Sequence, residues 1–198
     1  MRPRAPSPAV QTGLLVVAAM AAVMWIEEIA DQVAHAGWDR YGIRPRDTDG
    51  LEGVVTAPFL HGGFDHLIAN TVPFLLLGAA IAFSGAARVA LVTVIVMVVG
   101  GLGTWLVAPA GTVHIGASGL VFGYAAYLVA RGAFSRSLAQ VVLGLAVLAV
   151  WGTTLLRGLV PADGISWQGH LFGAVGGIVA AWLLERRRGQ VPAPARAG

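Results

Sequence analysis

Six apolar stretches divide this sequence, and each is long enough to cross a lipid bilayer. A hydrocarbon core of about 30 Å needs roughly 17 to 25 residues of helix. Of the 198 residues, 57% are hydrophobic and 12% are charged, and the mean hydropathy of +0.75 lies outside the range of soluble domains. The sequence therefore predicts an all-α polytopic membrane protein, with spans near residues 9–27, 66–86, 89–109, 116–133, 137–156 and 169–185.

The arginines predict the orientation of this six-transmembrane-helix bundle. If the N-terminus lies inside, nine arginines fall on the cytoplasmic side and four fall outside. Cytoplasmic loops of membrane proteins carry the excess of positive charge. Both termini are therefore expected to be cytoplasmic, in an integral, multi-pass protein of the cell membrane. The outer arginines are Arg40, Arg44, Arg46 and Arg157.

One membrane domain is expected over residues 9–186, with a long outer segment at about 28–60. The first apolar stretch follows two arginines, as a cleavable signal peptide would. Its length and the acidic residues Glu27, Glu28 and Asp31 after it favour a helix that is retained. The proline- and alanine-rich ends, 1–8 and 187–198, are expected to be disordered tails.

Composition also excludes some kinds of chemistry and partner. The chain has no cysteine, which removes disulfides, thiol catalysis and cysteine metal sites. The basic residues are spread between apolar runs rather than gathered on one face, so nucleic acid is not an expected partner. The expected partners are the bilayer and other membrane proteins, without a cofactor.

Polar residues at three predicted helix starts are the candidate functional groups. Ionisable side chains in membrane helices are costly and usually face a protein interior or a water-filled cavity. His66 and Asn70 are four residues apart and share one helix face, while His61 precedes them in the approach to that helix. Ser118 and His170 begin two later spans. All five therefore lie near the outer surface, at one depth.

Glycine spacing predicts how closely two of these helices meet. Gly119 and Gly123 lie on the helix of Ser118, and Gly169, Gly173 and Gly177 lie on the helix of His170. Small residues four apart let two backbones approach closely in lipid. Such a contact would place His170 within about 2.6 to 3.2 Å of the Ser118 hydroxyl, where it could act as the base for a serine nucleophile.

The remaining parts of an acyl-transfer site are also present. Asn70, with His66 and the backbone N–H of Ser118, could stabilise an oxyanion. No acidic residue is obviously placed to orient His170, so a Ser-His dyad is expected rather than a triad. Phe122, one turn after Ser118, is either a core aromatic or a packing surface for His170, and the two roles are compatible.

Each candidate also has a structural interpretation. A Gly-Ala-Ser-Gly stretch in an apolar helix is commonly a packing contact, and membrane histidines can be hydrogen-bonding partners or ligands of haem or a metal. No HExxH pattern is present, and Asp65 is the only acidic residue near the paired histidines. His114 has the weakest claim and is expected to be an interfacial loop residue.

Together, these motifs resemble the rhomboid family of intramembrane serine proteases. The order is His61, His66 and Asn70, then "GASG" at 116–119, then "GHLFG" at 169–173. The resemblance spans about residues 60 to 180. It implies that Ser118 is the nucleophile and His170 the general base, while His66, Asn70 and the Ser118 N–H form the oxyanion hole.

The resemblance further implies roles for His61 in local hydrogen bonding and for Gly116 in a close backbone turn. Phe122 stands where some members have tyrosine. The first outer segment lacks a clear Trp-Arg pair found in many members, and "WDR" at 38–40 is the nearest approach.

The expected function is intramembrane serine-type endopeptidase activity, a hydrolase reaction on transmembrane protein substrates, with the active site opening to the extracytoplasmic side. One alternative is a non-catalytic rhomboid-like protein that binds membrane helices. Another is a small transporter or a haem-binding membrane protein, which would leave Ser118 unexplained.

Overall fold

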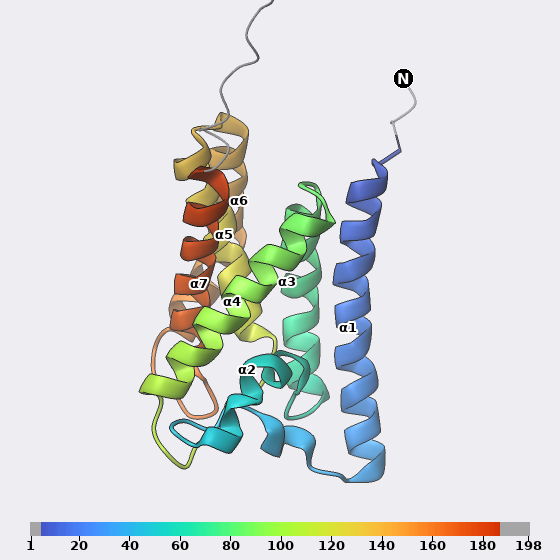
Figure 1. Cartoon of the computed structure of the whole chain (residues 1–198), viewed down its shortest axis with the longest axis vertical. Coiled ribbons are helices and arrows are strands. Elements are labelled where there is room, and N and C mark those ends of the chain that lie inside the picture. The colour runs from blue at the N-terminus through green and yellow to red at the C-terminus, as the bar shows by residue number, and fades with distance from the viewer. Residues whose placement is uncertain (1–4, 187–198) are drawn as a thin grey trace, which may run out of the picture.

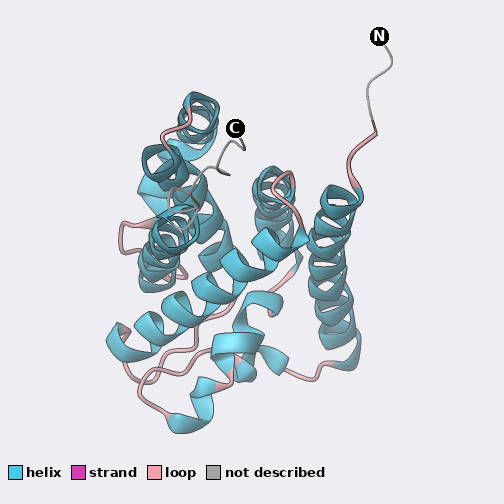
Figure 2. Cartoon of the chain, turned by 45° about the horizontal axis from the view of Figure 1, so that its top comes forward, coloured by secondary structure: helices cyan, strands magenta, loops and turns pink. Residues whose placement is uncertain are grey.

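The computed structural model describes residues 5–186, and helices make up most of this part of the chain (Figures 1 and 2). Within it, six helices of 18 residues or more run alternately up and down, and no strand is formed beyond one isolated bridge between Ile43 and His114. The long helices are α1 (Pro8–Ala34), α3 (Phe64–Ala82), α4 (Ala86–Val107), α5 (Ser118–Ser135), α6 (Leu138–Gly158) and α7 (Trp167–Arg186).

Four short helices follow α1 and lie at the end of the bundle where α3, α5 and α7 begin (Figure 1). We call this the loop end of the bundle. Trp38 and Arg40 of the "WDR" stretch lie in the first of them. The four are η1 (Trp38–Tyr41), η2 (Thr48–Leu51), α2 (Gly53–Thr56) and η3 (Ala57–Phe59).

Helix α1 is longer than the predicted span of 9–27, so the connecting segment begins at His35 rather than near residue 28. The helix continues through acidic residues that follow the apolar stretch: Glu28 is fully buried and Asp31 is 9% exposed. The Asp31 carboxylate accepts a hydrogen bond from the Trp38 N–H at 2.8 Å. These carboxylates are thus enclosed by protein, which allows the helix to continue past them.

At its other end, α1 is capped by Ser7, whose hydroxyl accepts from the Val10 N–H, and Pro8 is the first helical residue. Disorder was predicted for tails at 1–8 and 187–198. Residues 1–4 and all of the second tail lie outside the described residues.

Helix α5 is the central helix of the bundle. Ten of its 18 residues are buried, including Tyr124, Tyr127 and Leu128, and it packs against α3, α4, α6 and α7. The outward faces of the other helices are apolar and exposed, as at Leu15, Leu145 and Val150. In a soluble protein such surfaces would be unfavourable, whereas lipid accommodates them.

Five of the described long helices are apolar enough to cross a membrane, and α5 is the exception. Helix α5 carries Ser118, two tyrosines and the buried Arg131, and its neighbours separate it from the lipid. The protein is therefore an integral membrane protein with a helical bundle.

Glycines bring α5 and α7 together, as their spacing predicts. A Cβ atom at Gly173 would lie 2.3 Å from the Gly119 carbonyl oxygen, and one at Gly177 would lie 2.0 Å from the Gly123 carbonyl oxygen. Only glycine leaves room for such close backbones. The contact fixes the register of the two helices that carry Ser118 and His170.

The opposite end of the bundle is joined by a buried ionic cluster. Glu185 Oε1 lies 2.9 Å from Arg88 Nη1 and 3.2 Å from Arg131 Nε, and Tyr127 donates to the same oxygen at 3.4 Å. The Arg131 guanidinium also donates to Ser84. Helices α4, α5 and α7 are thereby tied together far from the loop end.

Candidate active site

Ser118 and His170 face each other at the loop end of α5 and α7. Ser118 is the first residue of α5, and His170 lies in the first turn of α7. The Ser118 Oγ is 2.9 Å from the His170 Nε2. The Phe122 ring lies parallel to the His170 ring, with centroids 4.1 Å apart and an interplanar angle of 5°. The histidine is thus held from one side by the serine and across its face by an aromatic ring.

A backbone carbonyl sets the orientation of His170. The His170 Nδ1 is 2.7 Å from the carbonyl oxygen of Gly158, the last residue of α6. A carbonyl can only accept, so Nδ1 carries the proton and Nε2 has a free lone pair towards Ser118. Carbonyls in the last turn of a helix have no partner within that helix, which leaves this one available. Sequence reasoning missed Gly158 because a carbonyl oxygen has no signal in residue type.

His61 supports the backbone just before Ser118. It is 1% exposed, and its Nε2 accepts a hydrogen bond from the Ala117 N–H at 3.2 Å. Its Nδ1 lies 3.3 Å from the Phe59 carbonyl oxygen and donates to it. Burial lowers the pKa of His61 from 6.5 to about 4, which is consistent with this neutral, hydrogen-bonded state.

His66 and Asn70 lie on the neighbouring helix α3. The His66 ring packs against Gly116, where a Cβ would fall 2.7 Å from the His66 Nε2. Gly116 has a φ of 108°, a conformation that favours glycine. Glycine is therefore required here for two reasons, the backbone angle and the space that the His66 ring occupies. The Asn70 side-chain amide donates to the His66 carbonyl oxygen at 3.0 Å.

An open cavity of about 790 Å³ joins these residues. Its polar lining includes His66, Asn70, Ser118 and His170, and its apolar lining includes Trp151 and Leu155 of α6. The structure therefore brings together four of the residues that the sequence placed at one depth. His61 is not among the residues that line the cavity; its ring meets the His66 ring edge-on, with centroids 5.1 Å apart, and its nitrogens bind backbone groups.

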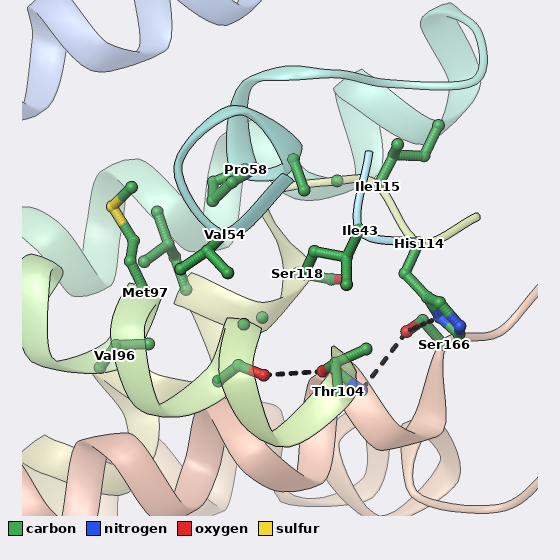
Figure 3. Close-up of a pocket in the computed structure, with 17 residues that line it drawn as sticks. Ile43, Val54, Pro58, Val96, Met97, Thr104, His114, Ile115, Ser118 and Ser166 are labelled. Carbon is green, nitrogen blue, oxygen red and sulfur yellow. Dashed lines mark hydrogen bonds between the residues drawn. The ribbon is translucent and has the colours of Figure 1, made fainter. Parts of the chain in front are cut away.

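A much smaller cavity of about 50 Å³ lies between Ser118, α4 and the short helices (Figure 3). Its walls are mainly apolar, with Val54, Val96 and Met97 among them, and Thr104 and His114 at its polar edge. The Thr104 hydroxyl donates to the Gly100 carbonyl at 2.7 Å and is thereby occupied within α4.

His114 lies in the loop before α5, as expected, but it is more closely integrated than an interfacial residue would be. Its backbone pairs with Ile43, through N–H to carbonyl contacts of 3.0 Å in both directions. Its Nδ1 lies 2.7 Å from the Ser166 hydroxyl and its Nε2 lies 2.8 Å from the Thr112 hydroxyl. Sequence reasoning missed Ser166, whose partner lies 52 residues away along the chain.

Comparison with known proteins connects this geometry to a family. The uncharacterized protein Rv1337 of Mycobacterium tuberculosis is 43% identical over 212 residues, covering all of this chain and 88% of the relative. The uncharacterized protein ML1171 of Mycobacterium leprae is 43% identical over 173 residues, covering 83% of this chain and 68% of the relative.

A more distant relative has a name that points to a function. The Bacillus subtilis protein YdcA, named as a proposed rhomboid protease, is 28% identical over 136 residues, covering 68% of each chain. The family model of the rhomboid domain matches residues 49–187, which is more than half of this sequence. This chain belongs to the rhomboid family.

Proposed function

We propose that this protein is an intramembrane serine endopeptidase in which Ser118 is the nucleophile and His170 the general base. The observation that carries the proposal is the 2.9 Å contact between Ser118 Oγ and His170 Nε2. The Gly158 carbonyl supports it, because it holds the histidine in the tautomer that can accept the serine proton. Family membership supports the same activity.

The reaction begins when His170 Nε2 takes the proton of Ser118 as Oγ attacks the carbonyl carbon of a substrate peptide bond. The tetrahedral intermediate then collapses, the C–N bond breaks, and His170 gives its proton to the departing amine. Water enters and loses a proton to His170 as it attacks the acyl-serine ester. Collapse of the second intermediate breaks the ester C–O bond, returns the proton from His170 to Ser118 and releases a carboxylic acid, which ionises in water.

The oxyanion hole of the proposal consists of the Asn70 side-chain amide, the His66 ring and the Ser118 N–H. The cavity brings both side chains onto one surface with Ser118. The Ser118 N–H belongs to the first turn of α5, where amides lack intrahelical acceptors and the helix dipole favours negative charge. Donors fixed before the substrate arrives stabilise the developing charge without reorganisation.

We further infer six transmembrane spans, two cytoplasmic termini and an active site that opens to the extracytoplasmic side of the cell membrane. The count of arginines in the sequence supports this orientation, with nine on the side predicted to be cytoplasmic and four on the other. The substrates of the proposal are transmembrane segments of other membrane proteins, because the cavity opens among the ends of apolar helices in an integral membrane protein of the rhomboid family.

The test is cleavage of a transmembrane substrate by purified protein in detergent. We expect wild type to cleave, and both Ser118→Ala and His170→Ala to lose cleavage. Ser135→Ala is the matched control, since it makes the same change, loss of a serine hydroxyl, at the other end of the same helix. A fluorophosphonate should label wild type and Ser135→Ala but not Ser118→Ala. Cleavage by Ser118→Ala at the wild-type rate would overturn the mechanism.

A further inference from the structure

Two serine–histidine pairs join the same two segments of this protein. In each pair the partners are 52 residues apart along the chain. His114 lies four residues before Ser118, and Ser166 lies four residues before His170. The second pair therefore links the loop that leads into α5 with the loop that leads into α7.

The donors and acceptors of this second pair can be assigned in only one consistent way. The Thr112 hydroxyl donates to the Pro109 carbonyl, so towards His114 it can only accept, and Nε2 of His114 must carry a proton. A neutral His114 then has a lone pair on Nδ1, and the Ser166 hydroxyl donates to it. Burial lowers the pKa of His114, which favours this neutral form.

Ser166 in turn holds the start of α7. Its hydroxyl oxygen accepts from the Gly169 N–H at 3.3 Å, and its carbonyl accepts from the His170 N–H at 3.0 Å. The Gly169 N–H is one of the donors that a helix start leaves unpaired, and the bond from the His170 N–H is the first backbone hydrogen bond of the helix. Figure 3 shows the His114 ring directed at Ser166, with the contact drawn from one loop to the other.

The backbone of His114 is fixed independently. It exchanges two backbone hydrogen bonds with Ile43 of the connecting segment, and these fix the backbone from which the ring extends. A continuous set of contacts thus runs from that segment, through His114 and Ser166, to the backbone of His170. The Ser118–His170 contact is a second link between the same two segments of the chain.

We propose that His114 is a positioning residue that sets the place of His170 relative to Ser118 by accepting a hydrogen bond from Ser166 at Nδ1. This inference rests on the proposed function. His114 does not contact the reacting atoms and acts through the first turn of α7. Because reacting groups lose rate steeply when displaced, by about 10²-fold for about 1 Å, even a small shift of this turn lowers kcat.

The two nitrogens of His114 can be replaced one at a time. The side-chain oxygen of asparagine takes roughly the place of Nδ1 and can still accept from Ser166. The amide of glutamine takes roughly the place of Nε2 and can still donate to Thr112, but it offers Ser166 no acceptor at the Nδ1 position. His114→Asn is therefore the conservative variant, and His114→Gln is its matched control.

The experiment measures kcat and KM for a transmembrane substrate with purified full-length variants in detergent. We expect His114→Gln and Ser166→Ala to lower kcat at least about tenfold while KM stays within about twofold, the signature of lost transition-state geometry. We expect His114→Asn to retain most of kcat. The double variant His114→Gln/Ser166→Ala should lose no more than the worse single variant, because the two residues act as one pair.

Two results would overturn the inference while leaving the proposed function intact. One is a kcat within about twofold of wild type in both His114→Gln and Ser166→Ala. The other is equal loss in His114→Asn and His114→Gln, which would mean that acceptance at Nδ1 is not what matters. A wild type no more active than Ser118→Ala would instead refute the proposed function and, with it, this role of His114.

Discussion

The contact between α5 and α7 makes Gly173→Ala the sharpest test of how helix packing controls the site. The new methyl group would lie 2.3 Å from the Gly119 carbonyl oxygen and 3.0 Å from the Gly119 carbonyl carbon. Ordinary van der Waals contact begins at 3.4 Å, so the two backbones must separate by about 1.1 Å (3.4 minus 2.3). Both contacting atoms belong to the backbone of a buried helix, and no flexible side chain can turn away.

The expected magnitude follows from that displacement. Gly119 adjoins Ser118, and Gly173 follows His170 by three residues, so the separation acts almost directly on the 2.9 Å contact between Oγ and Nε2. A displacement of about 1 Å lowers the rate by about 10²-fold. Overpacking costs about 1–3 kcal/mol, which the better helix propensity of alanine offsets by up to about 1 kcal/mol.

The assay compares cleavage rate and thermal unfolding in detergent for wild type, Gly173→Ala and Gly152→Ala. Gly152 is the matched control, because it lies within α6 and a Cβ there would meet nothing within 4 Å. We expect Gly152→Ala to keep activity and stability, and Gly173→Ala to lose both. A Gly173→Ala protein with wild-type kcat and unfolding temperature would refute the argument that this contact fixes the site.

Three further perturbations have defined outcomes. Glu185→Gln leaves the two arginines of the buried cluster without their counterion, so the free energy of unfolding should fall by about 3–5 kcal/mol and the thermal midpoint should fall with it. The control is Glu52→Gln at an exposed position, which should leave the thermal midpoint unchanged. Burial lowers the pKa of His61 in the folded protein to about 4, from 6.5 in the unfolded chain, so the unfolded state binds more protons between these values. The free energy of unfolding should therefore fall by up to about 3 kcal/mol as the pH is lowered from 6.5 to 4. Unfolding temperatures across that range should fall less in His61→Gln than in wild type, and an equal fall in both would contradict the assignment. Phe122→Leu removes the ring stacked on His170, a contact of about 0.5–1.5 kcal/mol, and should lower kcat about two- to tenfold; an unchanged kcat would show that the ring does not hold the histidine.

The sequence predicted the meeting of Ser118 and His170 because both of its determinants are local. Helix starts follow from the apolar stretches, and close approach follows from glycines at intervals of four. Gly173 against Gly119 and Gly177 against Gly123 are the contacts that this spacing requires. Two kinds of local information, the residue at which a helix begins and the helix face that carries glycines, were therefore enough to place two side chains on different helices beside each other.

The contacts that the sequence did not predict depend on backbone groups and on loops. The Gly158 carbonyl is a partner of His170 only because α6 ends beside α7, and no residue type records where a helix ends in space. His114 and Ser166 meet because two loops cross, one of which is braced on Ile43. The length of α1 was underestimated because the span was predicted from the apolar stretch alone, whereas the helix continues past Glu28, which other segments bury.

A carbonyl rather than a carboxylate behind His170 fits the surroundings of this site. A carboxylate beside the histidine would have to be taken out of water together with any positive charge that it stabilises, and burial of charge is unfavourable unless it is fully paired. The Gly158 carbonyl is neutral, and it is left without an intrahelical partner by the end of α6. It fixes the tautomer of His170 and still stabilises an imidazolium formed during the proposed reaction, because its dipole points at the Nδ1–H. The Ser118–His170 pair can therefore be oriented without a third ionisable residue.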